Sequence, residues 1–408
     1  MKYLHRGLER KFLRMSAFFK ALLVTGARQV GKTTMLRHLA AGQNRTYVTL
    51  DDIMARNLAK TDPALFFQTY KPPIIIDEAQ YAPELFGYIK ILCDQSGEPG
   101  RFWLTGSQQF SMMKNVQETL AGRIGILELH SLSKNEKEGI TFENELDFSL
   151  QGLRARQALA KKTDIVHIFD HIWHGGMPQV LHAGAEERRE YYNAYVTTYL
   201  MRDVTEFGGV TDALRFGKFL TACAALTGAQ VNYKTLADTA GITQPTAKEW
   251  LRLLEGSGII YLLRPYANNA LKRLTKAPKL YFLDTGLAAH LSMWLSRETL
   301  MNGAAAGHFF ENHIVAELVK NFACAPNTAR LSYYSDSNAK EIDLFVEQGH
   351  VIHPLEIKKA AAPDSREVKK FSVLEKAAAE RGCGGIVCMC EEVIPIDKQN
   401  CFIPCGLI

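Results

Sequence analysis

The sequence predicts a multidomain α/β protein whose first domain is built on a parallel β-sheet. A chain of 408 residues exceeds the size of one ordinary hydrophobic core, so several domains are expected. The apolar runs at residues 21–24 and 74–76 end in a glycine loop and in two carboxylates, which is typical of buried parallel strands with a binding site at their carboxyl ends. A composition of 47% hydrophobic and 22% charged residues is that of a folded globular chain.

A glycine-bounded loop follows the first predicted strand. The loop has the pattern Gly-x-x-x-x-Gly-Lys-Thr over residues 26–33, and residues 34–40 then have helical periodicity. Backbone N–H groups of such a loop, at the N-terminus of a helix, bind phosphate. We expect Lys32 to bind the β- and γ-phosphates of a nucleotide and the Thr33 hydroxyl to bind Mg²⁺. The expected nucleotide-binding residues are Gly26, Ala27, Arg28, Gln29, Val30, Gly31, Lys32, Thr33 and Thr34.

Two carboxylates end the predicted strand at residues 74–76, which follows the phosphate loop by some 45 residues. Asp77 is expected to hold Mg²⁺, directly or through water, and Glu78 to polarise the attacking water as general base. The alternative for this pair is a solvated acidic turn after a strand.

Two further predicted strands carry candidate catalytic residues. The strand at residues 101–107 ends in Ser107, our candidate for orienting the water or sensing the γ-phosphate, with Thr105 as the alternate. Arg123 precedes the strand at residues 124–129, and we consider it as an arginine finger toward its own γ-phosphate or that of a neighbouring subunit. The alternatives are ordinary turn residues and a surface arginine.

These residues resemble the AAA-type P-loop ATPases. Residues 26–33 look like Walker A, residues 74–78 like Walker B, and residues 104–107 like the sensor-1 strand. Residues 23–34 further resemble a widespread prokaryotic family that joins such an ATPase to a carboxy-terminal domain of unknown function, and the resemblance covers nearly the whole chain. It implies ATP and Mg²⁺ as cofactors and ATP hydrolysis as the activity. The expected domains are an ATPase core at residues 1–135 and a helical lid or linker at residues 136–215.

Residues 216–300 resemble a winged-helix domain. Gly241 makes the turn between two predicted helices, Thr243 caps the second, and strands are expected at residues 259–263 and 279–284. DNA and protein contact both remain open as the role of such a domain. The basic residues expected near the tip of the wing, with an exposed Tyr266, are Lys272, Arg273, Lys276 and Lys279.

Residues 301–408 resemble the restriction-endonuclease-like nucleases. Twelve residues separate Asp343 from Glu356-x-Lys358, so that a short hairpin brings the two carboxylates together. Carboxylate oxygens suit Mg²⁺, and a neighbouring lysine activates a water for attack on a phosphodiester. The resemblance implies Glu311 as a further carboxylate from a helix. The alternative is a degenerate nuclease fold without cleavage, and the proline that usually precedes the aspartate is absent.

The bulk features favour a cytoplasmic protein without a membrane partner. No apolar stretch reaches about 18 residues, and the first residues lack an apolar signal-peptide core. Five of the eight cysteines lie in the last 26 residues and are expected to be reduced core thiols in a reducing cytosol, with a metal site as the alternative: Cys383, Cys388, Cys390, Cys401 and Cys405. We therefore expect an ATPase that drives or gates a DNA-directed C-terminal half. The alternative is a nucleotide-gated regulatory protein with an inactive nuclease-like domain, and a protein partner or self-association is open.

Overall fold

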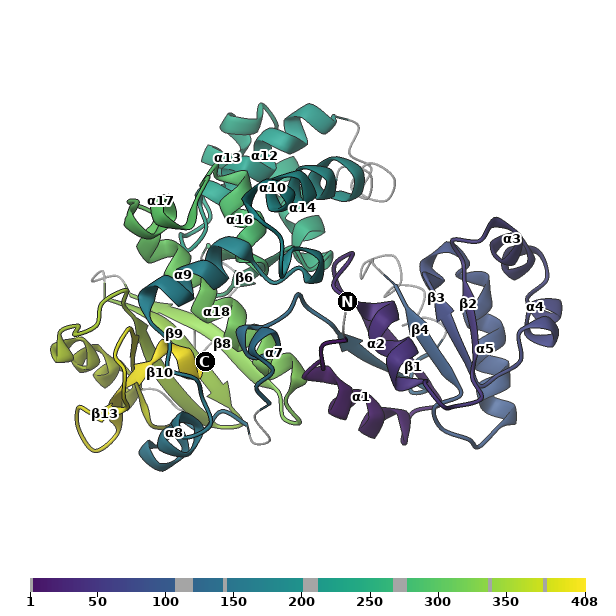
Figure 1. Ribbon diagram of the computed structural model, residues 1–408, viewed down its shortest axis with the longest axis horizontal. Helices are drawn as coiled ribbons and strands as arrows, with labels where there is room; N and C mark the ends of the chain where they lie inside the picture. The colour runs from purple at the N-terminus through teal and green to yellow at the C-terminus, as the bar shows by residue number, and fades with distance from the viewer. Residues whose placement is uncertain are drawn as a thin grey trace. The chain divides into compact units, whose positions relative to one another are not determined.

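The computed structural model describes residues 3–106, 120–141, 145–200, 212–266, 277–336, 340–376 and 380–408 (Figure 1). The chain divides into two compact units. The first comprises Met1–Leu132 with Arg252–Ile259, and the second comprises Ser133–Leu251 with Ile260–Ile408. Within the described parts of the chain, no helix is both long enough and apolar enough to cross a membrane.

A five-stranded parallel sheet forms the centre of the first unit, as the sequence predicts. Its strands stand in the order β2-β3-β4-β1-β5, so that the carboxyl ends of β3, β4 and β1 are adjacent. The residues of β1, β3 and β4 are all buried, which explains why the sequence shows them as apolar runs without alternation. The strands are β1 (Ala21–Thr25), β2 (Thr46–Thr49), β3 (Ile74–Asp77), β4 (Phe102–Thr105) and β5 (Ile124–Glu128).

Helices pack on both faces of this sheet. Alternate strand residues such as Leu23, Ile76 and Leu104 join one core cluster with residues of α3, α4 and α5. On the other face Phe12 of α1 contacts Trp103 edge to face, with ring centroids 4.8 Å apart. The helices of this unit are α1 (Leu8–Ser16), α2 (Lys32–Leu39), α3 (Ile53–Thr61), α4 (Pro63–Thr69), the short 3₁₀ helix η1 (Ala79–Tyr81) and α5 (Glu84–Gln95).

The second unit begins with helices where the sequence is charged and weakly patterned. Lys134 and Asn135 are 1% and 5% exposed, although their residue types indicate a solvated segment. Ser133 and Glu136 form a capping box that starts α7, and Gly139 ends that helix in the left-handed region. The first helices of the unit are α7 (Lys134–Glu138), α8 (Leu150–Gln157), α9 (Ile165–His174), η2 (Pro178–Val180), α10 (Ala185–Ala194) and the π-helical segment η3 (Tyr195–Leu200).

A helix-turn-helix followed by a two-stranded hairpin occupies the middle of the chain. Gly241, with φ 67°, ends α13, and the strands β6 and β7 pair antiparallel. The elements are α12 (Ala213–Ala225), α13 (Tyr233–Ala240), α14 (Gln244–Gly256), β6 (Ile260–Leu263) and β7 (Lys279–Phe282). Their order is the one predicted, while the winged-helix assignment and its DNA contact stay predictions.

Two residues expected to be exposed at the basic tip of the wing are buried or half-buried in the structure. Lys279 lies within β7 and is 4% exposed, because its ammonium pairs with Glu311 and Glu341 at 3.2 and 2.6 Å. Tyr266 is half-buried and packs against the ring of Phe345. Both expectations of exposure are therefore wrong. The remaining basic residues of the predicted tip, Lys272, Arg273 and Lys276, lie outside the described residues.

A mixed sheet carries the C-terminal part of the second unit. Strands β8, β9 and β10 form an antiparallel meander, and β12 and β14 continue it in parallel with β10. Helix α18 (Ala306–Cys324) has twelve buried residues. The strands are β8 (Ala329–Ser335), β9 (Glu341–Gln348), β10 (Val351–Ile357), β11 (Glu380–Arg381), β12 (Gly384–Cys388), β13 (Ile394–Pro395) and β14 (Asn400–Pro404). The other helical elements are α16 (Thr285–Leu291), α17 (Arg297–Asn302), η4 (Ser365–Lys376) and η5 (Cys405–Leu407). None of the eight cysteines forms a disulfide bond in the structure, and Cys324, Cys383 and Cys390 are only partly buried.

Candidate functional site

The loop between β1 and α2 is wound so tightly that its first glycine has no substitute. Gly26 has φ 136°, and a Cβ atom there would lie 2.0 Å from the carbonyl oxygen of Leu129. Gly31 precedes α2 with φ 98°, and Gln29 also adopts a left-handed conformation, with φ 61°. The loop therefore leads directly from a buried strand into the N-terminus of a helix, which is the arrangement that binds phosphate.

Two cationic side chains donate hydrogen bonds to carbonyl oxygens of this loop. Lys32 is 5% exposed, and its ammonium donates to the carbonyl oxygens of Gly26 and Ala27 at 3.0 and 2.8 Å. The guanidinium of Arg6, which lies just before α1, donates to the carbonyl oxygens of Val30 and His130, each at 2.7 Å. Sequence analysis identified Lys32 but not Arg6, because no motif connects Arg6 with the loop.

The side chains expected to hold Mg²⁺ lie together at the carboxyl ends of the strands. The Thr33 hydroxyl donates to Oδ1 of Asp77 at 2.7 Å, and the Tyr47 hydroxyl donates to Oδ2 at 3.1 Å. Asp77 is 6% exposed. Burial and the charge of Asp77 raise the pKa of Tyr47 to about 12, so this phenol stays protonated as a donor. One hydroxyl and one carboxylate at this spacing provide the oxygen ligands that Mg²⁺ prefers.

Thr105 connects Asp77 with Glu78. Its buried hydroxyl donates to Oδ1 of Asp77 and accepts from the backbone N–H of Glu78 at 3.1 Å. Glu78 has φ 56°, a left-handed conformation that is uncommon for a residue other than glycine. Gln80 donates to its carboxylate. The alternate residue Thr105 is thus in contact with the Asp77 carboxylate and the Glu78 backbone, while the preferred candidate Ser107 lies outside the described residues.

Arg123 lies at the amino-terminal end of the parallel strands, too far from the phosphate loop of its own chain to reach it. It precedes β5, and its carbonyl oxygen accepts from the N–H of Ala21, the first residue of β1. Its guanidinium binds the carboxylate of Asp94 on α5, with Nε and Oδ1 2.6 Å apart. Because the phosphate loop follows the opposite end of β1, a role for Arg123 as an arginine finger in cis is wrong. A contact with a neighbouring subunit's nucleotide stays a prediction.

The second predicted site lies on the β9–β10 hairpin. The register pairs Leu355 with Leu344, and extending it by one residue places Glu356 opposite Asp343. The Lys358 ammonium lies 2.8 Å from Oε2 of Glu356 and 3.2 Å from Oδ2 of Asp343. The charges of both carboxylates outweigh the effect of burial and raise the pKa of Lys358 above its usual value. The structure therefore brings together the three residues that the sequence selected.

Glu356 is a buried carboxylate with one unoccupied oxygen. The residue is 0% exposed, and Oε1 has no hydrogen-bond partner among the described residues. Burial and the negative charge of Asp343 raise the pKa of Glu356 to about 7. A bound cation is one way to satisfy such an oxygen, so these residues fit the predicted divalent metal.

Glu311 lies on the neighbouring helix α18 and is engaged by two donors. Tyr281 and Lys279 of β7 contact its Oε1 at 2.6 and 3.2 Å. Burial, opposed by Lys279 and reinforced by the charge of Asp343, raises the pKa of Glu311. Glu311 thus interacts electrostatically with the hairpin site, and its service as a metal ligand stays a prediction.

The chain is similar to three described domain families. Residues 18–137 match the family described as "AAA domain". Residues 166–298 match "Domain of unknown function (DUF8612)", and residues 306–408 match "Domain of unknown function (DUF4143)". An AAA domain followed by a carboxy-terminal domain of unknown function is the order that the resemblance predicts.

Curated relatives and solved structures resemble much of the chain. The uncharacterized protein Rv2008c of Mycobacterium tuberculosis and the uncharacterized protein Mb2031c of Mycobacterium bovis are each 29% identical over 358 residues, which cover 86% of this chain and 73% of theirs. The Walker-type ATPase PABY2304 of Pyrococcus abyssi is 14% identical, with 69% of this chain and 94% of that one covered and a TM-score of 0.45. The RuvB Holliday junction branch migration motor of Thermotoga maritima is 16% identical, with 64% and 90% covered and a TM-score of 0.32. With the family match over residues 18–137, the parallel sheet and its glycine loop support a P-loop fold of the AAA type at the start of this chain.

Proposed function

We propose that this protein binds ATP with Mg²⁺ and hydrolyses it at the carboxyl ends of β1, β3 and β4. The observation that carries the proposal is the 2.7 Å contact between the Thr33 hydroxyl and Asp77, beside a phosphate loop whose lysine is buried within it. Lys32 would exchange its two carbonyl contacts for the β- and γ-phosphates. Bound Mg²⁺ would neutralise phosphate charge, and Thr33 and Asp77 would hold it.

In the proposed reaction, water attacks the γ-phosphorus and the bond to the bridging oxygen breaks, releasing ADP and phosphate. Glu78 takes a proton from the attacking water. Thr105 acts as a positioning residue, because its hydroxyl contacts Asp77 and holds the backbone N–H of Glu78 at 3.1 Å.

Phosphate release by the purified protein tests this proposal. Lys32→Ala should abolish ATP binding or turnover, since the loop then lacks the cation that faces the phosphates. Lys60→Ala serves as the matched control, because Lys60 is an exposed lysine on α3 of the same unit. The proposal fails if Lys32→Ala and Lys60→Ala both hydrolyse ATP at the wild-type rate.

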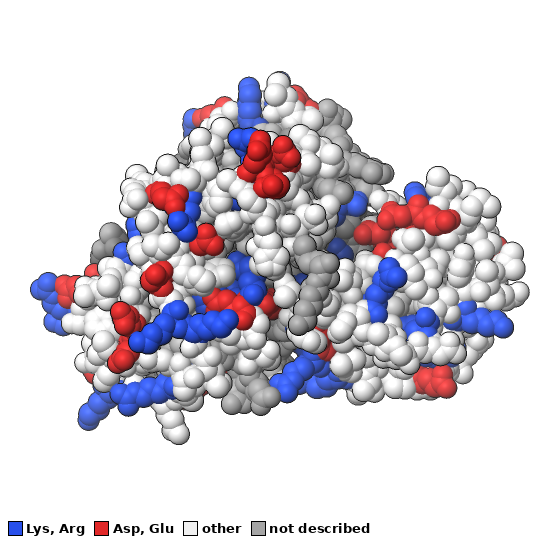
Figure 2. Space-filling model, in the orientation of Figure 1, with Lys and Arg blue, Asp and Glu red and all other residues white. Residues whose placement is uncertain are grey.

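A second candidate function is metal-dependent cleavage of a phosphodiester at Asp343, Glu356 and Lys358. The buried Oε1 of Glu356 without a donor, next to a lysine that contacts both carboxylates, favours a cation at this place. The two carboxylates would bind the metal, and Lys358 would orient the attacking water. DNA is the proposed substrate. Figure 2 shows basic and acidic side chains interspersed on the described residues of the face in view, so the surface charge there adds no support for DNA.

Incubation with plasmid and linear DNA in Mg²⁺ or Mn²⁺ tests the second candidate. Lys358→Ala should lose cleavage, whereas Lys369→Ala, an exposed lysine nearby in sequence, should retain it. Equal cleavage by the two variants would point to a contaminating nuclease. Absence of cleavage by the wild type, with an ATPase rate that changes when DNA is added, would favour the alternative of a nucleotide-gated regulatory protein with an inactive nuclease-like domain.

A further inference from the structure

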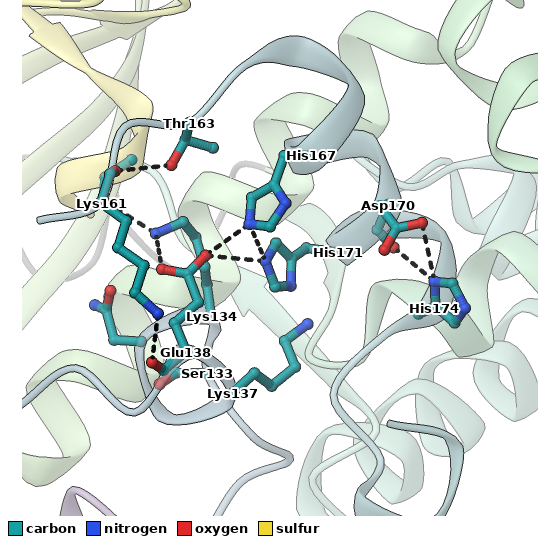
Figure 3. A network of polar contacts seen from close by, with 12 residues as sticks. Ser133, Lys134, Lys137, Glu138, Lys161, Thr163, His167, Asp170, His171 and His174 are labelled. Carbon is teal, nitrogen blue, oxygen red and sulfur yellow. Dashed lines mark hydrogen bonds and ion pairs between the residues drawn. The ribbon is translucent and has the colours of Figure 1, made fainter. Parts of the chain in front are cut away.

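Two histidines and a glutamate of the second unit, none of which belongs to either site described above, converge on one point (Figure 3). Nε2 of His167 lies 2.9 Å from Oε1 of Glu138, and Nε2 of His171 lies 3.1 Å from the same oxygen. The two Nε2 atoms are themselves 3.1 Å apart. Three potential ligand atoms thus form a nearly equilateral triangle.

The local structure fixes each member of this triangle. His167 and His171 are four residues apart on α9 and therefore share one face of the helix. Ile168, Phe169 and Ile172 of α9 are buried, which sets the rotation of the helix. Asp164 caps the helix by accepting from the N–H of His167 at 2.7 Å.

The carboxylate comes from α7, which is held firmly in the same unit. The backbone N–H of Lys134 donates to Glu317 of α18 at 2.8 Å, and the Asn135 side chain donates to the carbonyl oxygen of Ile408 at 3.2 Å. The Lys134 ammonium pairs with Oε2 of Glu138 at 3.0 Å, which leaves Oε1 facing the two imidazoles. Glu138 is therefore oriented by a neighbour, as metal-binding carboxylates usually are.

Hydrogen bonds alone satisfy this triangle poorly. A neutral imidazole carries one N–H proton, so two Nε2 atoms supply at most two protons for three contacts. If both protons point at Oε1, the two N–H groups lie side by side at the 3.1 Å separation of the nitrogens. If one of the two protons points at the Nε2 atom of the other imidazole, one of the two contacts to the Glu138 carboxylate has no proton. A single cation between the three atoms satisfies all of them at once.

We propose that Glu138, His167 and His171 bind one divalent transition-metal ion of the Zn²⁺ type, with a further coordination position open to solvent. Ligands about 2.0–2.1 Å from a tetrahedral zinc lie about 3.3 Å from one another. The observed separations of 2.9–3.1 Å need only a small opening to reach that value. The His167 side chain is 49% exposed, against 11% for His171 and 6% for Glu138, so solvent reaches the site from the His167 side.

The surrounding charges select the class of metal. Lys134 pairs with the Glu138 carboxylate, and only one oxygen of that carboxylate faces the imidazoles, so a hard cation such as Mg²⁺ or Ca²⁺, which needs several oxygen ligands, gains little here. Zn²⁺ and Co²⁺ bind neutral imidazole nitrogens strongly.

Such an ion would join α9 to α7 and thereby stabilise the second unit, because a ligand that binds only the folded state raises stability. The test uses untagged, full-length protein freed of metal by chelation and kept without nucleotide. Isothermal titration with Zn²⁺ should show a site of one-to-one stoichiometry and should raise the unfolding temperature. Mg²⁺ and Ca²⁺ should do neither, and Co²⁺ should give the visible absorption of a tetrahedral or five-coordinate complex.

Variants assign the site to these residues. His167→Ala is expected to fold, since this side chain is half-exposed, and to weaken Zn²⁺ binding by more than about 100-fold, because second-shell substitutions alone cost about 10–100-fold. Glu138→Gln should also weaken binding. His174→Ala is the matched control, because His174 lies on the same helix but contacts Asp170, and it should bind as the wild type does. Wild-type protein without a Zn²⁺ site, or a folded His167→Ala with unchanged affinity and Co²⁺ spectrum, would overturn the proposal.

Discussion

The hydroxyl of Thr105 offers a test of how the ATPase site is positioned. It is buried at the end of β4, donates to Asp77 and accepts from the N–H of Glu78 at 3.1 Å. Thr105→Val removes the hydroxyl while it retains the shape of the side chain. The substitution therefore removes the oxygen atom that contacts both the Asp77 carboxylate and the Glu78 backbone, and it alters neither of those residues.

The structure gives the size of the expected effect. A hydrogen bond to a charged group contributes about 1.5–3 kcal/mol, and a buried N–H left without an acceptor costs about 1–3 kcal/mol. With partial relaxation we expect Thr105→Val to lower the free energy of unfolding by about 2–4 kcal/mol. If about half of this is expressed as misplacement of Glu78 in the transition state, the ATPase kcat falls by about 5- to 30-fold, at 1.36 kcal/mol for each factor of ten.

Steady-state phosphate release and urea denaturation measure the two effects. Thr46→Val is the matched control. Thr46 is the first residue of the edge strand β2, at the amino-terminal end of the sheet, and its exposed hydroxyl donates to the carbonyl oxygen of Lys71. We expect this control to hydrolyse ATP at close to the wild-type rate. If Thr105→Val folds and its kcat stays within about twofold of the wild-type value, which is less than the expected fall, then Thr105 does not position the catalytic groups.

Three further predictions concern the loop and the second unit. Gly26→Ala should abolish nucleotide binding in a fluorescent-nucleotide assay, because its Cβ would lie 2.0 Å from the Leu129 carbonyl oxygen; normal affinity would mean that the loop is not rigid. Arg6→Ala should lower the free energy of unfolding by about 2–4 kcal/mol in urea, since a buried guanidinium then no longer donates to two carbonyls. Burial lowers the pKa of His290 to about 4, below its value in the unfolded chain, so its contribution to stability is present above pH 6.5 and is lost as pH falls toward 4. His290→Phe should make thermal stability less sensitive to pH over that range, and an unchanged pH profile would contradict the assignment.

The sequence predicted the first unit well because its signals are local. The strands β1, β3 and β4 are short, buried and followed by polar residues that meet at the carboxyl end of the sheet, so the sequence alone places Thr33, Asp77 and Glu78 together. The error over Arg123 was avoidable. In a parallel sheet, a residue that precedes a strand lies at the opposite end from residues that follow a strand. This polarity excludes a contact in cis between Arg123 and a γ-phosphate at the loop after β1.

Other contacts depend on the tertiary structure and leave no sequence pattern. Arg6 reaches Val30 and His130 across 24 and 124 residues of chain. Lys279 appeared to belong to an exposed basic tip, but two carboxylates compensate its burial. The spacing of His167 and His171 on a helix was visible as a signal, whereas the third member of their triangle, Glu138, comes from a different helix and could not be selected from the many other acidic residues.

A single-turnover experiment with Glu78→Gln tests the central claim most directly. Wild-type protein and the variant are each mixed in excess with radiolabelled ATP and Mg²⁺, and the bound nucleotide is identified after separation. We predict that the wild type converts its bound ATP to ADP, while Glu78→Gln binds ATP with similar affinity and keeps it uncleaved, because the phosphate loop is intact but the general base is absent. Conversion of ATP to ADP by Glu78→Gln at the wild-type rate would contradict the proposed site.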